Sequence, residues 1–422
     1  MVDAGTDTDL SALIWTPQRS AALDRLERFA PRAGRAYAAR RNFDFGPQDR
    51  SNVSALSPWI RHRLILEEEV LSSVLQRHSF SAAEKFVQEV FWRGYFKGWL
   101  EHRAQVWARY RSDLSDCLEG LDRDPALRDR YEAAVEGRSG IDCFDAWAKE
   151  LVATGYLHNH TRMWFASIWI FTLHLPWQLG ADLFLRHLLD GDPASNTLGW
   201  RWVGGLHTRG KTYLARASNI ARYTDGRFDP AGQLATAAPA LSEPALDAPR
   251  SPQFDATPKD IGRFGLLVTE EDGQPETLDL PGRPSALLGL AATAERSPLA
   301  VSDVARSFAE AAVGDALSRA AEAFGAEPAH TGDLQPGAEA WGPRLVDWAR
   351  NRDLSVIVTA APPVGPIRDS LTTAGPVLAD AGITLLTVAR RYDRAVWPHA
   401  GKGFFQLKAK IPKLLNGLGL SA

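Results

Sequence analysis

Residues 154–202 carry the side chains that could do the most chemistry. Asp190 and Asp192 flank a glycine, and Asn196 stands four residues before Trp200, one turn away if the segment is helical. Carboxylates at such a spacing can bind a metal ion. No third ligand follows at a suitable spacing, so we predict no metal site. The simpler interpretation is a buried helix pair in which Arg162 and Asp190 form an ion pair and the tryptophans fill the core.

Composition excludes several classes of protein. The chain has 422 residues, a formal net charge of −3 and two cysteines. It is therefore neither a disulfide scaffold nor a globally basic nucleic-acid binder, and it cannot supply four thiolates to an iron–sulfur cluster. A local basic stretch is present, because six cations face one acid, Asp225, between residues 201 and 227: Arg201, Arg209, Lys211, Arg216, Arg222 and Arg227. A solvated surface and a phosphate-binding surface both explain it.

The elements that must position these groups are helices up to about residue 228. The segment 21–40 reads as a helix with an apolar face at Leu23, Leu26 and Phe29. Ser81 and Glu84 resemble a capping box that opens the next long helix. Eleven of the 14 tryptophans lie in this part of the chain: Trp15, Trp59, Trp92, Trp99, Trp107, Trp147, Trp164, Trp169, Trp177, Trp200 and Trp202.

A change of composition divides the chain. Residues 229–259 are rich in proline and alanine, which predicts a linker between a helical domain at 1–228 and a second domain at 260–422. In the second domain, short apolar runs at 264–268, 286–290, 354–359 and 382–388 predict strands, the last two separated by a helix at 367–381. This pattern favours a smaller α/β domain with a parallel sheet.

Targeting signals are not evident. The first ten residues lack the basic and apolar stretches of a secretory signal. Residues 163–181 carry no formal charge, but they include a proline, a histidine and other polar groups, so we predict a buried helix and no membrane span. We expect a cytoplasmic protein in which Cys117 and Cys143 stay reduced.

Six segments, taken in order, resemble the FAD-binding helical domain of DNA photolyases and cryptochromes. The resemblance covers about half the chain, residues 17–230. The segments are Tyr37–Arg41, Leu56–Ile60, Gln88–Arg93, Glu136–Gly140, Thr154–Met163 and Asp190–Trp202. Each segment alone is weak, whereas six in the family's order are specific.

The resemblance implies one FAD, held by residues that match the family's positions. Ser54, Leu56, Ser57 and Tyr37 match the cradle of the phosphates, and Arg93 matches a basic residue near the cofactor. Arg162 and Asp190 match the ion pair beside the isoalloxazine ring, and Asp192 the carboxylate at its N3 edge. Asn196 matches the residue opposite flavin N5, where an amide favours the reduced flavin.

The resemblance also implies an electron relay and a lesion pocket. Trp200 and Trp177 match two of the family's three relay tryptophans, and the third is one of Trp107, Trp164 and Trp169. The residues that match the pocket for a flipped cyclobutane pyrimidine dimer are Glu89, Trp92, Asn159, Met163 and Trp202. The (6-4) enzymes carry histidines where this chain has Asn159 and Met163, which favours the cyclobutane dimer. Arg209, Lys211 and Arg216 are expected to contact DNA phosphates.

The domain order differs from the family's. Typical members place an α/β antenna domain before the helical domain, whereas here the α/β part follows it and resembles that antenna domain over residues 354–415. No second chromophore and no protein partner is identified. Three changes in the cradle and near it, Ala55, Val53 and His160, are expected to weaken the affinity for FAD or DNA.

Three functions follow from these matches. The first is a carbon–carbon lyase of the deoxyribodipyrimidine photolyase kind, which repairs dimers under blue light with reduced FAD. The second is a cryptochrome-like photoreceptor without repair activity. The third is a flavoprotein with neither activity, which only the altered phosphate cradle supports.

Overall fold

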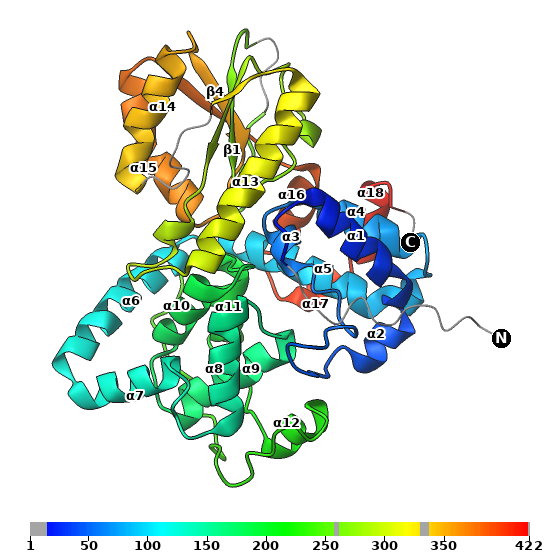
Figure 1. Cartoon of the computed structure of the whole chain (residues 1–422), viewed down its shortest axis with the longest axis vertical. Coiled ribbons are helices and arrows are strands. Elements are labelled where there is room, and N and C mark those ends of the chain that lie inside the picture. The colour runs from blue at the N-terminus through cyan, green and yellow to red at the C-terminus, as the bar shows by residue number, and fades with distance from the viewer. Residues whose placement is uncertain (1–14, 257–260, 330–336, 421–422) are drawn as a thin grey trace.

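The computed structural model describes residues 15–256, 261–329 and 337–420. We call residues 15–228 the helical region, because all its regular structure is helical (Figure 1). Its α-helices are α1 (Arg19–Phe29), α2 (Arg35–Arg40), α3 (Ser57–Arg61), α4 (Glu67–Leu75), α5 (Phe80–Glu101), α6 (Gln105–Arg123), α7 (Pro125–Val135), α8 (Asp142–Thr154), α9 (Asn159–Ser167), α10 (Trp177–His187), α11 (Pro193–Val203) and α12 (Ala217–Tyr223).

Two local predictions at the start of this region are wrong. The helix predicted over residues 21–40 is interrupted, because Gly34 takes a non-helical ψ of −134° before α2. Leu23 does not belong to the apolar face, since it is 39% exposed while Leu26 and Phe29 are buried. The cap of α5 is Ser79 and not Ser81, because the hydroxyl of Ser79 accepts the N–H of Ala82 at 3.4 Å.

The uncharged segment 163–181 is not one continuous helix. Helix α9 ends at Ser167, a π-helical turn follows over Ile168–Thr172, and α10 begins at Trp177. His174 breaks the path between them with a φ of +51°. Within the described part of the chain, no helix is long and apolar enough to cross a bilayer.

Five parallel strands form the sheet seen in the described residues. They are β1 (Gly265–Thr269), β2 (Ala286–Leu290), β3 (Pro328–Ala329), β4 (Val356–Ala360) and β5 (Thr384–Val388), in the order β3-β2-β1-β4-β5. The order reverses between β1 and β4. We call residues 261–389 the sheet region. The prediction of a smaller α/β part with a parallel sheet after a helical part is confirmed.

Helices cover both faces of this sheet (Figure 1). Helix α13 (Asp303–Phe324) packs on one face, where Leu266 and Val268 of β1 meet Val313 and Leu317. Helices α14 (Trp341–Arg350) and α15 (Pro366–Asp380) pack on the other, where Leu267 points. Because both of their faces are buried, β1 and β2 are nearly continuous apolar runs, as the sequence indicated.

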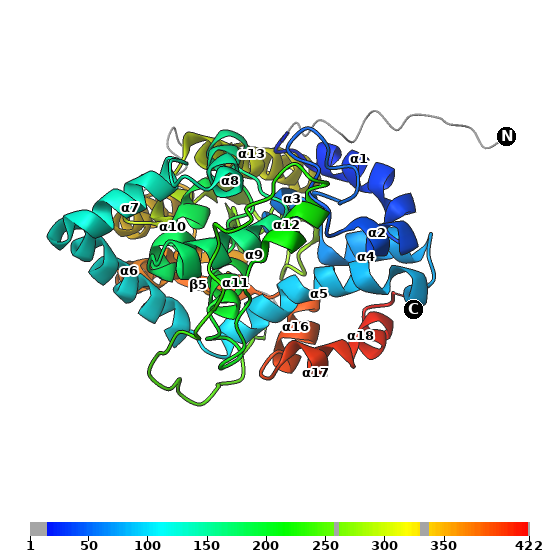
Figure 2. The same cartoon turned by 90° about the horizontal axis from the view of Figure 1, so that it is seen from below.

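The last described residues, Arg391–Leu420, turn back onto the helical region (Figure 2). We call them the C-terminal segment; it contains α16 (Arg391–Val396), α17 (Phe404–Lys408) and α18 (Ile411–Gly417). Its buried side chains, such as Tyr392, Trp397 and Phe404, belong to the core of the helical region and not to either core of the sheet. The domain limits expected from the sequence stay a prediction.

Residues 230–256 form neither helix nor strand. They run along the helical region and are tied to it by hydrogen bonds. The Leu241 N–H donates to Gly204 O at 2.9 Å, and the Arg250 N–H donates to His102 O at 2.9 Å. The Glu243 carboxylate also pairs with the buried guanidinium of Arg201.

Candidate functional site

The loop before α3 carries the predicted phosphate-cradle residues Ser54, Leu56 and Ser57. Arg25 fixes this loop, since its Nε donates to Ser54 O at 2.8 Å. Between Ser54 and Leu56, Ala55 has a φ of +50°, a conformation that costs a side-chain-bearing residue roughly 1–2 kcal/mol. Such strain is typical of functional loops. The sequence places the loop, whereas the strain at Ala55 is visible only in the structure.

Tyr37 lies on α2 and is buried against Phe29 and Phe86, with ring centroids at 6.0 and 5.2 Å. Burial raises the pKa of Tyr37 well above its usual range, so the phenol stays neutral. A neutral hydroxyl can donate a hydrogen bond to an anionic ligand.

The segment between α10 and α11 brings the predicted acids into place. Arg162 Nη2 donates to Asp190 Oδ2 at 2.9 Å, so this ion pair is present. Asp192 caps α11, because its Oδ1 accepts the N–H of Ser195 at 2.7 Å. Both carboxylates are buried.

Asp192 is part of a buried group of four charges. Its Oδ2 lies 3.4 Å from Lys97 Nζ and 4.0 Å from Arg61 Nε. Both cations also reach Glu271 of the sheet region, with Arg61 Nη2 at 2.7 Å and Lys97 Nζ at 3.5 Å from its carboxylate oxygens. No side chain of the four is more than 4% exposed. Burial alone would raise the pKa of Asp192, but Lys97, Arg61 and Arg93 outweigh it and hold that pKa well below its usual range.

Several buried polar atoms near these acids lack a hydrogen-bond partner among the residues that the structure describes. They include Asp190 Oδ1 and the Nε and Nη2 atoms of Arg93. Each such atom costs about 1–3 kcal/mol when it stays unpaired. The polar edge of an isoalloxazine ring and a pyrophosphate offer donors and acceptors of the kinds these atoms need. The donor set therefore fits FAD.

Asn196 lies on α11, and its Nδ2 donates to Ala181 O at 2.8 Å. This bond fixes the orientation of the amide and leaves its oxygen to accept from another group. An amide oxygen here is suited to an N–H donor such as the protonated N5 of a reduced flavin.

Both predicted relay tryptophans are buried, and their ring contacts differ. Trp200 meets Trp169 edge to face at 6.1 Å, and Trp169 meets Tyr131 at 6.1 Å. Trp177 lies 5.7 Å from Tyr110, which lies 5.4 Å from Trp107. Trp164, another candidate for the third relay position, stacks instead on Trp147 and His160.

The predicted lesion-pocket residues lie on α5, α9 and α11, which pack together. Glu89, Trp92, Met163 and Trp202 are half-buried and Asn159 is exposed. Glu89 forms an ion pair with Arg41, and burial raises the pKa of its carboxyl in spite of that cation. Trp92 stacks on Phe404 and Trp202 on Tyr213, with centroids at 3.7 and 5.6 Å. Phe404 was not found from the sequence, because it is more than 300 residues away from its partner.

Two neighbouring histidines serve the structure. The ring of His158 accepts the N–H of His160 at 3.1 Å and so caps α9. His160 hydrogen-bonds Asn42 O and the Tyr213 hydroxyl at 3.0 and 3.2 Å. The predicted phosphate contacts Arg209, Lys211 and Arg216 are all exposed on the stretch after α11.

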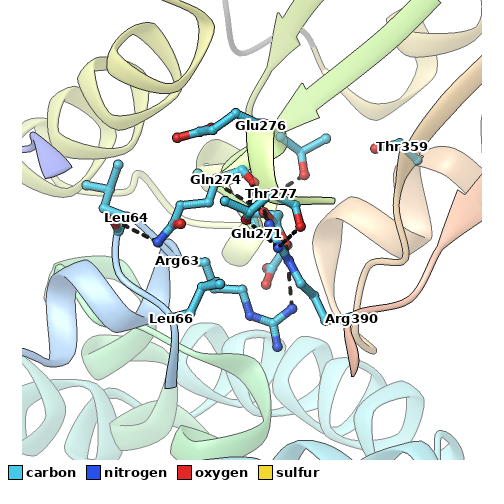
Figure 3. A network of polar contacts seen from close by, with 12 residues as sticks. Arg63, Leu64, Leu66, Glu271, Gln274, Glu276, Thr277, Thr359 and Arg390 are labelled. Atoms are coloured by element: carbon cyan, nitrogen blue, oxygen red, sulfur yellow. Dashed lines mark hydrogen bonds and ion pairs between the residues drawn. The ribbon is translucent and has the colours of Figure 1, made fainter. Parts of the chain in front are cut away.

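The carboxyl end of the sheet faces the helical region. Ligands of such sheets usually bind at this end, where the strand order reverses. Here the loop after β1 pairs with side chains of other elements: Asp272 accepts both Nε and Nη2 of Arg390, and Gln274 Nε2 donates to Glu69 Oε2 at 2.6 Å. Figure 3 shows this network, with Arg63 and Leu64 from the helical region beside Gln274, Thr277 and Arg390 from the sheet region and its end.

Sequence reasoning missed these partners. The signal was present as two charged runs, Arg61–Arg63 at the end of the buried helix α3 and Glu270–Asp272 directly after the buried strand β1. Charges that follow buried elements so closely must be paired. Which run pairs with which cannot be read from local sequence.

Comparison with known proteins finds relatives of the helical region. Residues 86–242 match the family model described as the FAD binding domain of DNA photolyase. The chain is 32% identical to a deoxyribodipyrimidine photo-lyase of Agrobacterium fabrum, over 46% of this chain and 39% of that protein. It is also 32% identical to one of Thermus thermophilus, over 51% of this chain and 49% of that protein.

Among solved structures, the Synechocystis cryptochrome is 24% identical, with a TM-score of 0.42, over 51% of this chain and 45% of the other. The chain thus spans about half the length or less of the relatives it matches. By this model and these relatives, the helical region of the chain is similar to the FAD binding domain of DNA photolyases.

Proposed function

We propose that this chain is a blue-light-driven flavoprotein that binds one FAD and repairs cyclobutane pyrimidine dimers in DNA. One observation carries the proposal. Helices α9 and α11 each carry one candidate side chain for binding the flavin, which is buried or ion-paired. Each also carries candidate side chains for binding the lesion, which are more open to solvent. On α9 these are Arg162 for the flavin and Asn159 and Met163 for the lesion, and on α11 they are Asn196 and Trp202.

The residues of the chain then have separate tasks. Arg93, Asp190 and Asp192 pair the polar groups of FAD, and the strained loop at Ser54–Ser57 accepts the phosphates. When bound, reduced FAD would supply the electron for dimer splitting. Trp92 and Trp202 hold the two flipped bases by stacking, and Glu89 and Asn159 hydrogen-bond their edges. The amount of FAD bound to the purified protein tests cofactor binding alone.

The deciding experiment follows dimer loss in a defined oligonucleotide under blue light, with the flavin fully reduced. Loss of dimers in the light and none in the dark is the expected result. The (6-4) photoproduct serves as the control substrate and is expected to remain. FAD-loaded protein that leaves dimers intact and binds damaged and undamaged DNA equally would contradict the proposal.

A photoreceptor without repair activity is the second candidate, and one observation favours it. The buried group of Asp192, Arg61, Lys97 and Glu271 joins the proposed flavin site directly to the sheet region. A change of flavin charge could thereby act on a part of the chain that resembles a displaced antenna domain. Light-dependent protease sensitivity of the sheet region without repair would favour this candidate. The unpaired Cys117 and Cys143 support a cytoplasmic setting for either function.

A further inference from the structure

The C-terminal segment is firmly seated along α5, beside the proposed lesion pocket (Figure 2). Two glycines of α5 allow the close approach. A Cβ atom at Gly94 would lie 2.9 Å from the Tyr392 hydroxyl, and one at Gly98 would lie 2.8 Å from the Trp397 Cα. The main chain of the segment also contributes a contact, because the carbonyl oxygen of Gly401 accepts a hydrogen bond from Arg103 Nη2 at 3.0 Å. These contacts fix α16 and the turn after it against α5, and α17 follows directly.

Phe404 of α17 forms the closest aromatic stack with the pocket. Its ring lies parallel to that of Trp92, with centroids 3.7 Å apart and planes 13° apart. The same ring meets Tyr95 edge to face at 5.5 Å. Phe404 is buried, while Trp92 keeps part of its surface open. Phe404 therefore fixes the plane of the indole proposed to stack on a flipped base.

The next residue, Phe405, points away from the protein. It is 80% exposed, whereas the other exposed large apolar side chains of the described residues are 39–45% exposed. Its ring centroid is 6.5 Å from that of Phe404, so it stands one ring beyond the Trp92 stack. This phenyl ring is therefore open to a partner outside the protein.

The charge around Phe405 indicates the kind of partner. Residues 394–420 contain five cations and no acid: Arg394, Lys402, Lys408, Lys410 and Lys413. Lys408 pairs with Glu84 at 3.2 Å. Lys402, Lys410 and Lys413 are exposed and form no ion pair with a carboxylate of the described residues, and Lys410 Nζ lies 3.0 Å from His399 Nδ1. An aromatic ring among lysines whose charges no carboxylate neutralises suits a polyanion with flat bases, which is a nucleic acid.

We propose that the C-terminal segment is part of the DNA-binding surface. Phe405 stacks on a base left unpaired next to the flipped dimer, and Lys402, Lys410 and Lys413 contact phosphates on the same side. This inference rests on the proposed function, because it takes Trp92 as a wall of the lesion pocket. It adds a surface from the far end of the chain to the exposed stretch of Arg209, Lys211 and Arg216.

The test measures DNA binding in the dark by fluorescence anisotropy, with the full-length, FAD-loaded chain. The probe is a labelled duplex with one thymine dimer. Phe405→Ala is expected to weaken binding about tenfold, the usual effect of losing one base stack, and Phe405→Tyr to restore it. Val304→Ala, an exposed apolar residue on α13, is the matched control and should bind as the parent does.

The lysines are tested by salt dependence. Replacing Lys402, Lys410 and Lys413 together by alanine should reduce the slope of log affinity against log salt by about 0.9 for each lysine that neutralises a phosphate. Lys149→Ala, an exposed lysine on α8, should leave the slope unchanged. All these side chains are exposed, so the melting temperatures should match that of the parent.

Three outcomes would overturn the inference. They are equal DNA affinity of the parent and Phe405→Ala, a chain that binds no DNA, and a segment that recruits anionic lipid vesicles in place of DNA. Dimer repair with unchanged affinity in Phe405→Ala removes this inference and leaves the proposed function. DNA binding that depends on Phe405, without any dimer repair, keeps this inference and removes the proposed repair activity.

Discussion

Glu271 of the sheet region is linked to the proposed flavin site by shared ion-pair partners. It shares Arg61 and Lys97 with Asp192, so the four buried charges balance. Glu271→Gln removes one negative charge and leaves an excess of positive charge beside Asp192. The midpoint potential of bound FAD is therefore expected to rise, by roughly tens of millivolts at an effective protein dielectric constant near 20.

Spectroelectrochemical titration of the FAD-loaded protein checks this shift. Glu276→Gln is the matched control, because Glu276 pairs with Arg319 and takes no part in the group of four. An unchanged potential in Glu271→Gln would show that the sheet region has no electrostatic influence on the flavin.

The tryptophan contacts make a second prediction at this scale. Trp200 touches Trp169, whereas Trp164 stacks on Trp147 and His160. Trp200→Phe and Trp169→Phe are each expected to slow flavin reduction under blue light with an external reductant, because each removes one oxidisable ring of the Trp200–Trp169 contact. Trp164→Phe should photoreduce at the parental rate. Equal rates in all three variants, followed by absorbance of the flavin, would show that electrons take another route.

At the scale of elements, the packing of α10 on α11 is set by a glycine. A Cβ atom at Gly180 would lie 2.2 Å from Trp200 Cη2 and 3.0 Å from Trp169 Cε2. Gly180→Ala is therefore expected to lower the free energy of unfolding by about 1–3 kcal/mol through overpacking.

Gly199, on α11, provides the opposite case, because a Cβ atom there would meet no other atom within 4 Å. Gly199→Ala should raise the free energy of unfolding by about 0.5–1 kcal/mol through helix propensity alone. Urea denaturation measures the free energy of unfolding of both variants, which should fall for Gly180→Ala and rise for Gly199→Ala. Destabilisation of similar size at both positions would contradict the packing argument.

Elements with a strong local signal were predictable from the sequence. The run at 286–290 is β2, and the helix predicted at 367–381 is α15 shifted by one residue. The break between α1 and α2 depends on the backbone of Gly34, which a pattern of apolar residues does not report. The placement of Phe404 on Trp92 is a contact between distant parts of the chain, which neither helical nor strand periodicity encodes. The site residues came from family positions, and their partners in the sheet region came only from the structure.

On the scale of the whole molecule, buried ion pairs join the sheet region to the helical region. Asp272 accepts two hydrogen bonds from Arg390 and lies 3.7 Å from Arg63. Asp272→Asn leaves these cations without their full charge partner, so the free energy of unfolding at pH 7 should fall by about 3–5 kcal/mol. Glu119→Gln, in an exposed pair with Arg123, should change it by less than about 1 kcal/mol.

The contribution of Asp272 to the free energy of unfolding depends on pH in a definite direction. Burial opposes ionisation of Asp272, but Arg390 and Arg63 outweigh it and lower its pKa below the usual range. A carboxyl whose pKa is lower in the folded state stabilises the protein above its unfolded pKa of about 3.9, and that stabilisation is lost as the pH falls through the folded value. The difference between the parent and Asp272→Asn should therefore shrink below about pH 4. A constant difference from about pH 7 to about pH 3 in urea titrations would contradict this account.

The return of the C-terminal segment onto α5 has a consequence for biosynthesis. Helix α5 ends at Glu101, and the segment that covers it begins at Arg391. At roughly 5–20 residues per second, a ribosome needs about 15–60 s to make the chain between them. During that time the face of α5 around Phe91, Gly94 and Gly98 is open to other chains. The helical core closes only after the sheet region has emerged, so a nascent chain of this protein depends on chaperones for longer than its helical content suggests.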